Sequence, residues 1–388
     1  MDRTKITYGG WYQRTTLHLS EICDLMAFGK SNLDLDKNKL IEFKNNLGIE
    51  TITREAGYLE FVRAKTKEGI EIRYYEDGLY ILELDSEDIK QGSKLLENYF
   101  NNKLNPAISY IFSLGAPTPK ELANIKTTHP TVITIIADEP VSFKIDPDQF
   151  GSVYSTIQSK DILVHKTPRF LFIVSKQNLA SIRELVEMQI FFREFKDQLE
   201  KYLNIHRHIW EEISDIKERG YISGSEIELL RSRLDSYQKT VSLISNRINQ
   251  MGSYIRTRSS IAKGFQLEDY LVKLFQFKFE ILTDTLDYIK EVWKMTTDYL
   301  SSAVQIIVEI KNQSTTRGIQ SLQLITSIGV VAGILGYISK TELPQMTGIG
   351  GLYFALIMAT TWFINYTVTR IYKNKKYKLK FAERAKDI

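Results

Sequence analysis

The chain has 388 residues, a formal net charge of +4 and 43% hydrophobic residues, so it is long enough for a sizeable core and further segments. The charge is uneven, because residues 370–388 carry a net charge of +6 and residues 1–369 a net charge of −2. A slightly acidic body excludes the bulk electrostatic footprint of a nucleic-acid-binding protein, and no nucleic-acid partner is expected. The single cysteine, Cys23, excludes an intramolecular disulfide and a thiolate metal cluster.

Residues 1–176 are predicted to form a cytoplasmic α/β domain. Three β-rich runs are separated by short turns that contain glycine, which is typical of β-hairpins: Leu59–Thr66, Ile70–Tyr75 and Leu79–Leu84. A helix is expected from Ser86 to Lys103. The other elements expected here are strands at Ile108–Phe112, Thr131–Ile136, Val141–Ile145 and Phe170–Val174, a helix from Lys120 and a helix over Gln149–Gln158.

Residues 177–317 are predicted to form a helical, coiled-coil stalk. A first helix is expected from about Asn178 to Arg219, and Ser223 with Glu226, or Ser225 with Glu228, is a capping box for the second. The second helix has a heptad seam of Ile227, Leu230, Leu234, Tyr237, Val241, Ile244, Ile248 and Met251. A third helix begins near Leu267 and meets no Pro or Gly before Gly318. Its predicted seam is Leu271, Leu274, Ile281, Tyr288, Val292, Met295 and Tyr299.

Two uncharged apolar runs, residues 318–338 and 349–369, are joined by the short loop 339–348. Each reaches the roughly 20 residues that a membrane-spanning helix needs, which predicts a two-helix transmembrane hairpin. The alternative is a buried hairpin in the core of a soluble protein. The basic tail, residues 370–388, places the end of the second run on the cytoplasmic side and the loop outside. The N-terminus has no apolar signal region, so both termini are expected in the cytoplasm, at an inner or plasma membrane.

A short string at the end of the first run is similar to a known signature. Residues 332–338 read Ala-Gly-Ile-Leu-Gly-Tyr-Ile, and a proline, Pro344, follows in the loop. Together with the order of the segments, this string resembles the CorA family of divalent-cation channels, whose first span ends in Ala-Gly-Ile-Tyr-Gly-Met-Asn. In the pore-mouth signature Gly336 matches, but Tyr337 and Ile338 stand in place of Met and Asn. Ile338 offers no hydrogen bond to the waters of Mg²⁺, which argues against Mg²⁺ uptake through the usual filter.

The resemblance implies a homopentamer with the first span lining a pore. In that run Gln320, Gln323 and Ser327 lie on one stripe, with Thr326 beside it. The apolar Val330 follows and could gate the pore. These five are therefore the predicted pore-lining residues. Hydrogen bonding between neighbouring helices is the alternative role for such side chains.

The predicted fold class is thus an α+β cytoplasmic domain, long coiled-coil helices and a CorA-like transmembrane hairpin. The predicted function is a homopentameric ion channel controlled by its cytoplasmic domain. Divergent CorA-like proteins occur as effectors of type III CRISPR antiviral systems, so the resemblance implies activation by a small nucleotide messenger. A divergent Zn²⁺ or Mg²⁺-like transporter and a membrane-anchored coiled-coil scaffold remain alternatives.

No catalytic or metal-binding constellation is recognisable, so an enzyme is not expected. The cofactors considered are a nucleotide activator or divalent cations, and no residue is assigned to either. The expected partners are further copies of the chain, the lipid bilayer and a small nucleotide.

Overall fold

The computed structural model describes residues 3–12, 18–115, 129–140, 143–159, 161–176, 181–338 and 348–378. The chain divides into two compact units. The first, which we call the sheet unit, comprises residues 1–205 and 243–292, and the second, the helical unit, comprises residues 206–242 and 293–388. The domain boundaries expected from the sequence, after residues 176 and 317, stay predictions.

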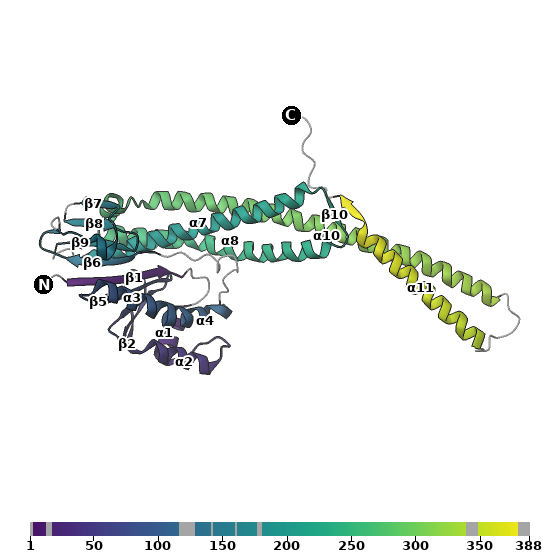
Figure 1. Cartoon of the computed structure of the whole chain (residues 1–388), viewed down its shortest axis with the longest axis horizontal. Coiled ribbons are helices and arrows are strands. Elements are labelled where there is room, and N and C mark those ends of the chain that lie inside the picture. Colours follow the sequence, from purple (N-terminus) through teal and green to yellow (C-terminus); the bar gives the residue numbers. More distant parts are fainter. Residues whose placement is uncertain are drawn as a thin grey trace, which may run out of the picture. The chain divides into compact units, whose positions relative to one another are not determined.

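Nine strands of the described chain form one mixed sheet in the order β2-β3-β4-β5-β1-β6-β9-β8-β7 (Figure 1). Adjacent strands are antiparallel except β6 and β9, which run parallel with Thr131 opposite Phe170. Strand β1 therefore lies at the centre of the sheet, between the antiparallel strands β2–β5 and the group β6, β9, β8 and β7, which holds the parallel pair. The strands are β1 Arg3–Trp11, β2 Ile49–Glu55, β3 Phe61–Thr66, β4 Glu71–Tyr75, β5 Leu79–Asp85, β6 Thr131–Ile136, β7 Ser155–Ser159, β8 Ile162–Lys166 and β9 Phe170–Ser175.

Helices cover both faces of this sheet, and the alternation of side chains along β1 shows which helix lies where. Ile6 points toward α3, where its side chain occupies the space beside Gly92. Gly9 lies on the other face against Ile190 of α7, the helix Ile182–Glu218, and the Trp11 ring stacks on Phe195 of α7 with centroids 5.2 Å apart. The helices that precede α7 in the chain are α1 Leu19–Phe28, α2 Lys37–Leu47, α3 Ile89–Tyr99 with a π-helical turn at Phe100–Leu104, α4 Asn105–Gly115 and α6 Pro147–Phe150.

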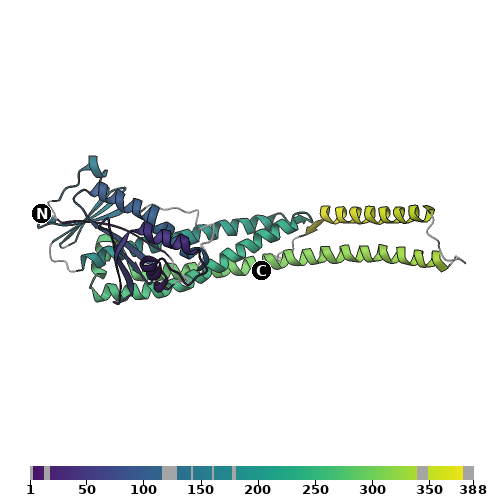
Figure 2. The same cartoon turned by 90° about the horizontal axis from the view of Figure 1, so that it is seen from below.

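Three long helices, α7, α8 and α10, contribute residues to both units. They span α7 Ile182–Glu218, α8 Ile227–Gly264 and α10 Phe279–Ile338, with the short helix α9 Glu268–Tyr270 and a π-helical turn at Leu271–Phe275 before α10. In the helical unit, β10 Tyr221–Ser223 pairs with β11 Lys376–Lys378. Helix α11, Gly348–Asn374, runs antiparallel to the end of α10 (Figures 1 and 2).

The hairpin strands expected from the sequence are confirmed as β3, β4 and β5, and Thr131–Ile136 and Phe170–Val174 are confirmed as β6 and β9. The strand expected at Ile108–Phe112 is wrong, because these residues lie in α4, where Ile108 and Ile111 are buried on one helix face. The helix expected over Gln149–Gln158 is also wrong, since α6 ends at Phe150 and β7 follows. Residues 143–145 form no strand, and residues 141–142 and the helix expected from Lys120 to residue 128 lie outside the described residues.

The seam predicted for the second stalk helix is confirmed, because all eight of its residues are buried in α8. Ser223 and Glu226 are hydrogen-bonded, with the backbone N–H of Ser223 donating to Glu226 Oε2 at 3.1 Å. Ser223 lies in β10 and α8 begins at Ile227, so the pair precedes the helix and is not the expected capping box. The uninterrupted helix from Leu267 is wrong, since Gln276 adopts a left-handed conformation with φ of 59° before α10 begins. The seam predicted on α10 is wrong at three positions, Ile281, Tyr288 and Met295, which are 56%, 61% and 55% exposed.

The predicted transmembrane hairpin is wrong, and with it the transmembrane part of the fold class. Over the described ranges, which omit residues 339–347 and 379–388, none of the helices combines the length and the apolar character required to cross a bilayer. The prediction relied on the absence of charge. That criterion is incomplete, because amides and hydroxyls such as those of Gln323 and Thr326 also lose hydrogen bonds to water in hydrocarbon. The predicted membrane localisation and orientation rested on the same two spans and are wrong for the same reason.

Candidate functional site

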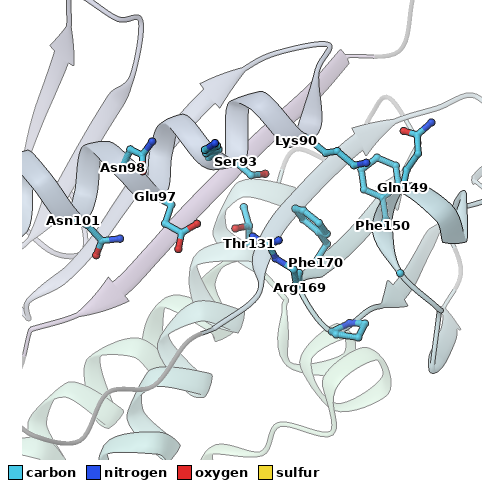
Figure 3. A pocket seen from close by; sticks show the side chains of 13 residues that line it. Lys90, Ser93, Glu97, Asn98, Asn101, Thr131, Gln149, Phe150, Arg169 and Phe170 are labelled. Atoms are coloured by element: carbon cyan, nitrogen blue, oxygen red, sulfur yellow. The ribbon is translucent and has the colours of Figure 1, made fainter.

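A cleft of about 590 Å³ opens on the sheet unit beside α3. Its walls come from four separate parts of the chain (Figure 3). These are α3 with the turn after it, the first residue of β6, the end of α6, and the turn that leads into β9. The volume is within the range of about 300–1,000 Å³ found for small-molecule sites. We call this site the α3 cleft. It is lined by Lys90, Ser93, Lys94, Glu97, Asn98, Asn101, Thr131, Gln149, Phe150, Gly151, Pro168, Arg169 and Phe170.

One wall of the cleft is a polar face of α3. Residues three and four apart lie on one side of a helix, so Lys90, Lys94 and Asn98 share a face that Glu97 and Asn101 extend. The helix is held at its start by Asp88, whose carboxylate accepts the backbone N–H of Gln91 at 3.0 Å. Its apolar side packs on β1 and β5. Amphipathic packing therefore fixes which side chains of α3 face the cleft.

The opposite wall is formed where β6 and β9 begin side by side. The backbone N–H of Thr131 donates to the Arg169 carbonyl at 3.0 Å, which places both residues at the same end of the parallel pair. Figure 3 shows Thr131, Arg169 and Phe170 facing Glu97 and Asn101 across the cleft. The guanidinium-bearing side chain of Arg169 is exposed, whereas Phe170 is buried.

An aromatic surface closes the end of the cleft near the start of α3. The Phe150 ring meets the rings of Phe170 and Phe172 edge-on, at centroid distances of 5.6 and 5.3 Å. Lys90 reaches over the Phe150 ring, with its Nζ 6.0 Å from the centroid (Figure 3). A cation and an aromatic face therefore lie next to each other.

The charges of the cleft favour an anion. Lys90, Lys94 and Arg169 carry positive charge, and Glu97 is the one acidic residue among the lining residues. All three cations are exposed, so they keep their hydration until a ligand arrives. Lysine and arginine donate charge-assisted hydrogen bonds to phosphate oxygens. The carboxylate of Glu97 with Asn98 and Asn101 offers acceptors and amide groups for hydroxyls or a heterocycle.

The predicted pore-lining residues all lie on α10, away from the α3 cleft in sequence and in the other unit. Gln323, Thr326 and Ser327 are exposed, and the Ser327 hydroxyl donates to the carbonyl of Gln323 at 2.7 Å. The side chains of Gln320, Val330, Gly336, Tyr337 and Ile338 lie outside the described part of the structure. The pore-lining role stays a prediction, although the membrane span on which it depended is wrong.

No pattern in the sequence predicted the α3 cleft as a site. One signal was present, because Lys90 and Lys94 are four residues apart in a segment predicted to be helical. The sequence around Arg169 and Phe150 gives no sign that they belong to a site. They reach the cleft only through the pairing of β6 with β9 and the packing of α6. No set of three or more His, Cys, Asp or Glu residues that suits a metal ion is found within the described ranges.

Comparison with known proteins found no match among protein-family models, curated proteins or solved structures. The resemblance to the CorA family therefore stays a prediction from the sequence.

Proposed function

We propose that the sheet unit is a binding module for a small nucleotide, which occupies the α3 cleft. The observation that carries this proposal is the convergence of Lys90, Lys94 and Arg169, from two elements, on one cleft that also exposes an aromatic ring. Phosphates suit the cations, and a flat base suits the face of Phe150. Glu97 and Asn98 of α3, with Asn101 of the turn after it, suit ribose hydroxyls or base edges.

The proposal keeps one part of the function expected from the sequence, the control of the protein by a nucleotide ligand. Ion conduction requires membrane spans and is not part of it. A role in antiviral defence, assembly into a homopentamer and the absence of catalysis stay predictions.

Binding is tested by isothermal titration calorimetry of the full chain with ATP, AMP, adenosine and inorganic phosphate. We expect ATP to bind more tightly than AMP, and both more tightly than adenosine or phosphate alone. The reason is that ATP and AMP offer both phosphate for the cations and a base for the Phe150 ring, whereas adenosine and inorganic phosphate each offer only one of the two. Titration at two salt concentrations should weaken ATP binding at the higher one, because the cations are exposed to solvent.

Two substitutions locate the site, Lys94→Gln and Arg169→Gln. Each removes one charge-assisted hydrogen bond worth about 1.5–3 kcal/mol, which corresponds to a roughly 10- to 150-fold weaker ATP affinity. The matched control is Lys65→Gln, which removes an exposed lysine from β3 of the same unit without touching the cleft. The proposal is refuted when ATP does not bind below about 1 mM, or when Lys94→Gln and Arg169→Gln both bind ATP as well as Lys65→Gln does.

A further inference from the structure

Next to Thr131, which lines the α3 cleft, Arg193 of α7 bonds to the chain near the ends of two neighbouring strands. Its Nη1 donates to the carbonyl of Pro130 at 3.0 Å, and its Nη2 donates to the carbonyl of Gly9 at 3.1 Å. The ladder between β1 and β6 extends only to the pair Thr7–Val132, so both carbonyls lie just beyond it. Glu194 accepts from Nε and Nη2 of the same guanidinium, at 3.2 and 2.9 Å. Arg193 therefore clamps two carbonyls that lie beyond the end of the β1–β6 ladder.

The clamped segment is continuous with the cleft. Pro130 is followed by Thr131, which lines the cleft, and preceded by His129, whose Nε2 lies 3.4 Å from Glu194 Oε1 and 3.7 Å from Asp197 Oδ2. Three consecutive residues thus connect the cleft wall to α7. Thr131 is joined in turn to Arg169 by a backbone hydrogen bond of 3.0 Å. A displacement of this wall is therefore expected to change the contacts that His129 and Pro130 make with α7.

Tyr8 of β1 lies close to both Glu97 and Glu194. Its ring packs against Phe100, next to α3, with a centroid distance of 5.2 Å. Its pKa is raised to about 12, first by burial and then by the negative charges of Glu97 in the cleft and Glu194 on α7.

We propose that Arg193 is a positioning residue that couples occupancy of the α3 cleft to helix α7. The proposal rests on the proposed nucleotide binding. A ligand phosphate that draws Arg169 and Thr131 toward itself shifts the Pro130 carbonyl, and the guanidinium transmits the shift to α7. The coupling is reciprocal, so a change at Arg193 changes the nucleotide affinity although this side chain does not line the cleft. The guanidinium places its N–H donors apart in a fixed plane, so it reaches two separate carbonyls and a carboxylate, and the single nitrogen of lysine does not reproduce this geometry.

The test compares wild type with Arg193→Lys and with the control Arg183→Lys. Arg183 lies on the same helix, but its side chain is 51% exposed and pairs with the adjacent Glu184. Two quantities are measured with ATP as the probe. One is the dissociation constant, and the other is hydrogen–deuterium exchange of the α7 segment Ile182–Ile205 with and without ATP. Circular dichroism verifies that each variant is folded.

We expect Arg193→Lys to change the ATP dissociation constant by about 5- to 150-fold and Arg183→Lys to leave it unchanged. ATP should alter exchange in α7 of wild type and of Arg183→Lys, but much less in Arg193→Lys. Equal ATP affinities of Arg193→Lys and wild type, or wild-type α7 exchange that ATP does not alter, overturn the coupling and leave the cleft as a binding site. Absence of ATP binding to wild type overturns the proposed function itself. If Arg193→Lys does not fold, the exchange of wild-type α7 with and without ATP decides alone.

Discussion

Replacement of Arg258 by methionine is expected to destabilise the sheet unit by about 3–5 kcal/mol. Arg258 of α8 and Asp77 of the β4–β5 turn are each 1% exposed. The guanidinium donates from Nε to Asp77 Oδ2 at 2.7 Å and from Nη2 to Oδ1 at 2.9 Å, and it lies 4.9 Å from the centroid of the Tyr75 ring. Methionine keeps most of the volume but leaves the Asp77 carboxylate buried without its counter-ion. The backbone N–H of Leu79, at 3.1 Å, remains as a donor and does not replace a charge.

An exposed ion pair of the same unit provides the matched control. Arg54 and Glu60 form a close pair, but their side chains are 47% and 45% exposed. Solvent screens such a pair, so Arg54→Met should leave the urea midpoint nearly unchanged. The double variant Asp77→Asn with Arg258→Met removes both buried charges. It should lose less stability than the sum of the two single variants, because neither charge is then left unpaired.

Urea unfolding followed by tryptophan fluorescence measures these differences. Trp11 is a suitable reporter, because its Nε1 donates to the Asp77 carbonyl at 2.6 Å and the indole changes environment when this contact is lost. The free energy of unfolding is obtained from the midpoint and the slope. A loss below about 1 kcal/mol for Arg258→Met, with an unchanged slope, would refute the reasoning, because a buried charge would then carry no larger cost than an exposed one.

Three further substitutions test other parts of the sheet unit by the same urea assay. Burial raises the pKa of Glu187, so the folded state binds this proton more tightly than the unfolded state. Wild type should therefore lose stability relative to Glu187→Gln as the pH rises above about 4, and a constant difference up to about pH 8 would contradict this. Gly78→Ala should cost more than about 2 kcal/mol, because φ is 89° and the added Cβ would overlap the Tyr12 carbonyl oxygen; a cost below about 1 kcal/mol would show that the turn relaxes. Asp36→Ala should cost about 0.5–2 kcal/mol, since Asp36 caps α2 by accepting the Asn38 N–H at 2.8 Å, and no loss would mean that the cap contributes nothing.

Several elements follow from local patterns and were predictable for that reason. The eight seam residues of α8 recur at intervals of three and four, so they lie on one face of the helix and are all buried there. The β4–β5 turn needs a residue with positive φ, and glycine at position 78 marks it. By contrast, Ile108–Phe112 contains residue types that suit either a strand or a helix. The contacts of α4 with α2 and with the turn at Phe100–Leu104 decide in favour of the helix.

The register of a helix against its partner is also not a local property. Ile281, Tyr288 and Met295 repeat every seven residues and so indicate a seam, yet Leu282, Leu286, Ile289 and Trp293 are buried instead. Both stripes are apolar, and only the packed neighbours select between them. The transmembrane prediction failed in a related way, because it used the charge of a segment as a measure of its whole polarity.

The hairpin strands and the seam of α8 could be predicted from the sequence, because each depends on residues close together in the chain. Only the tertiary structure decided the pairing of Asp77 with Arg258, which are 181 residues apart, and the insertion of β1 between β5 and β6. The α3 cleft belongs to the second group. Its cations come from α3 and from the turn before β9, and no spacing in the sequence relates them, because their distance is set by the order of the strands on which these segments lie.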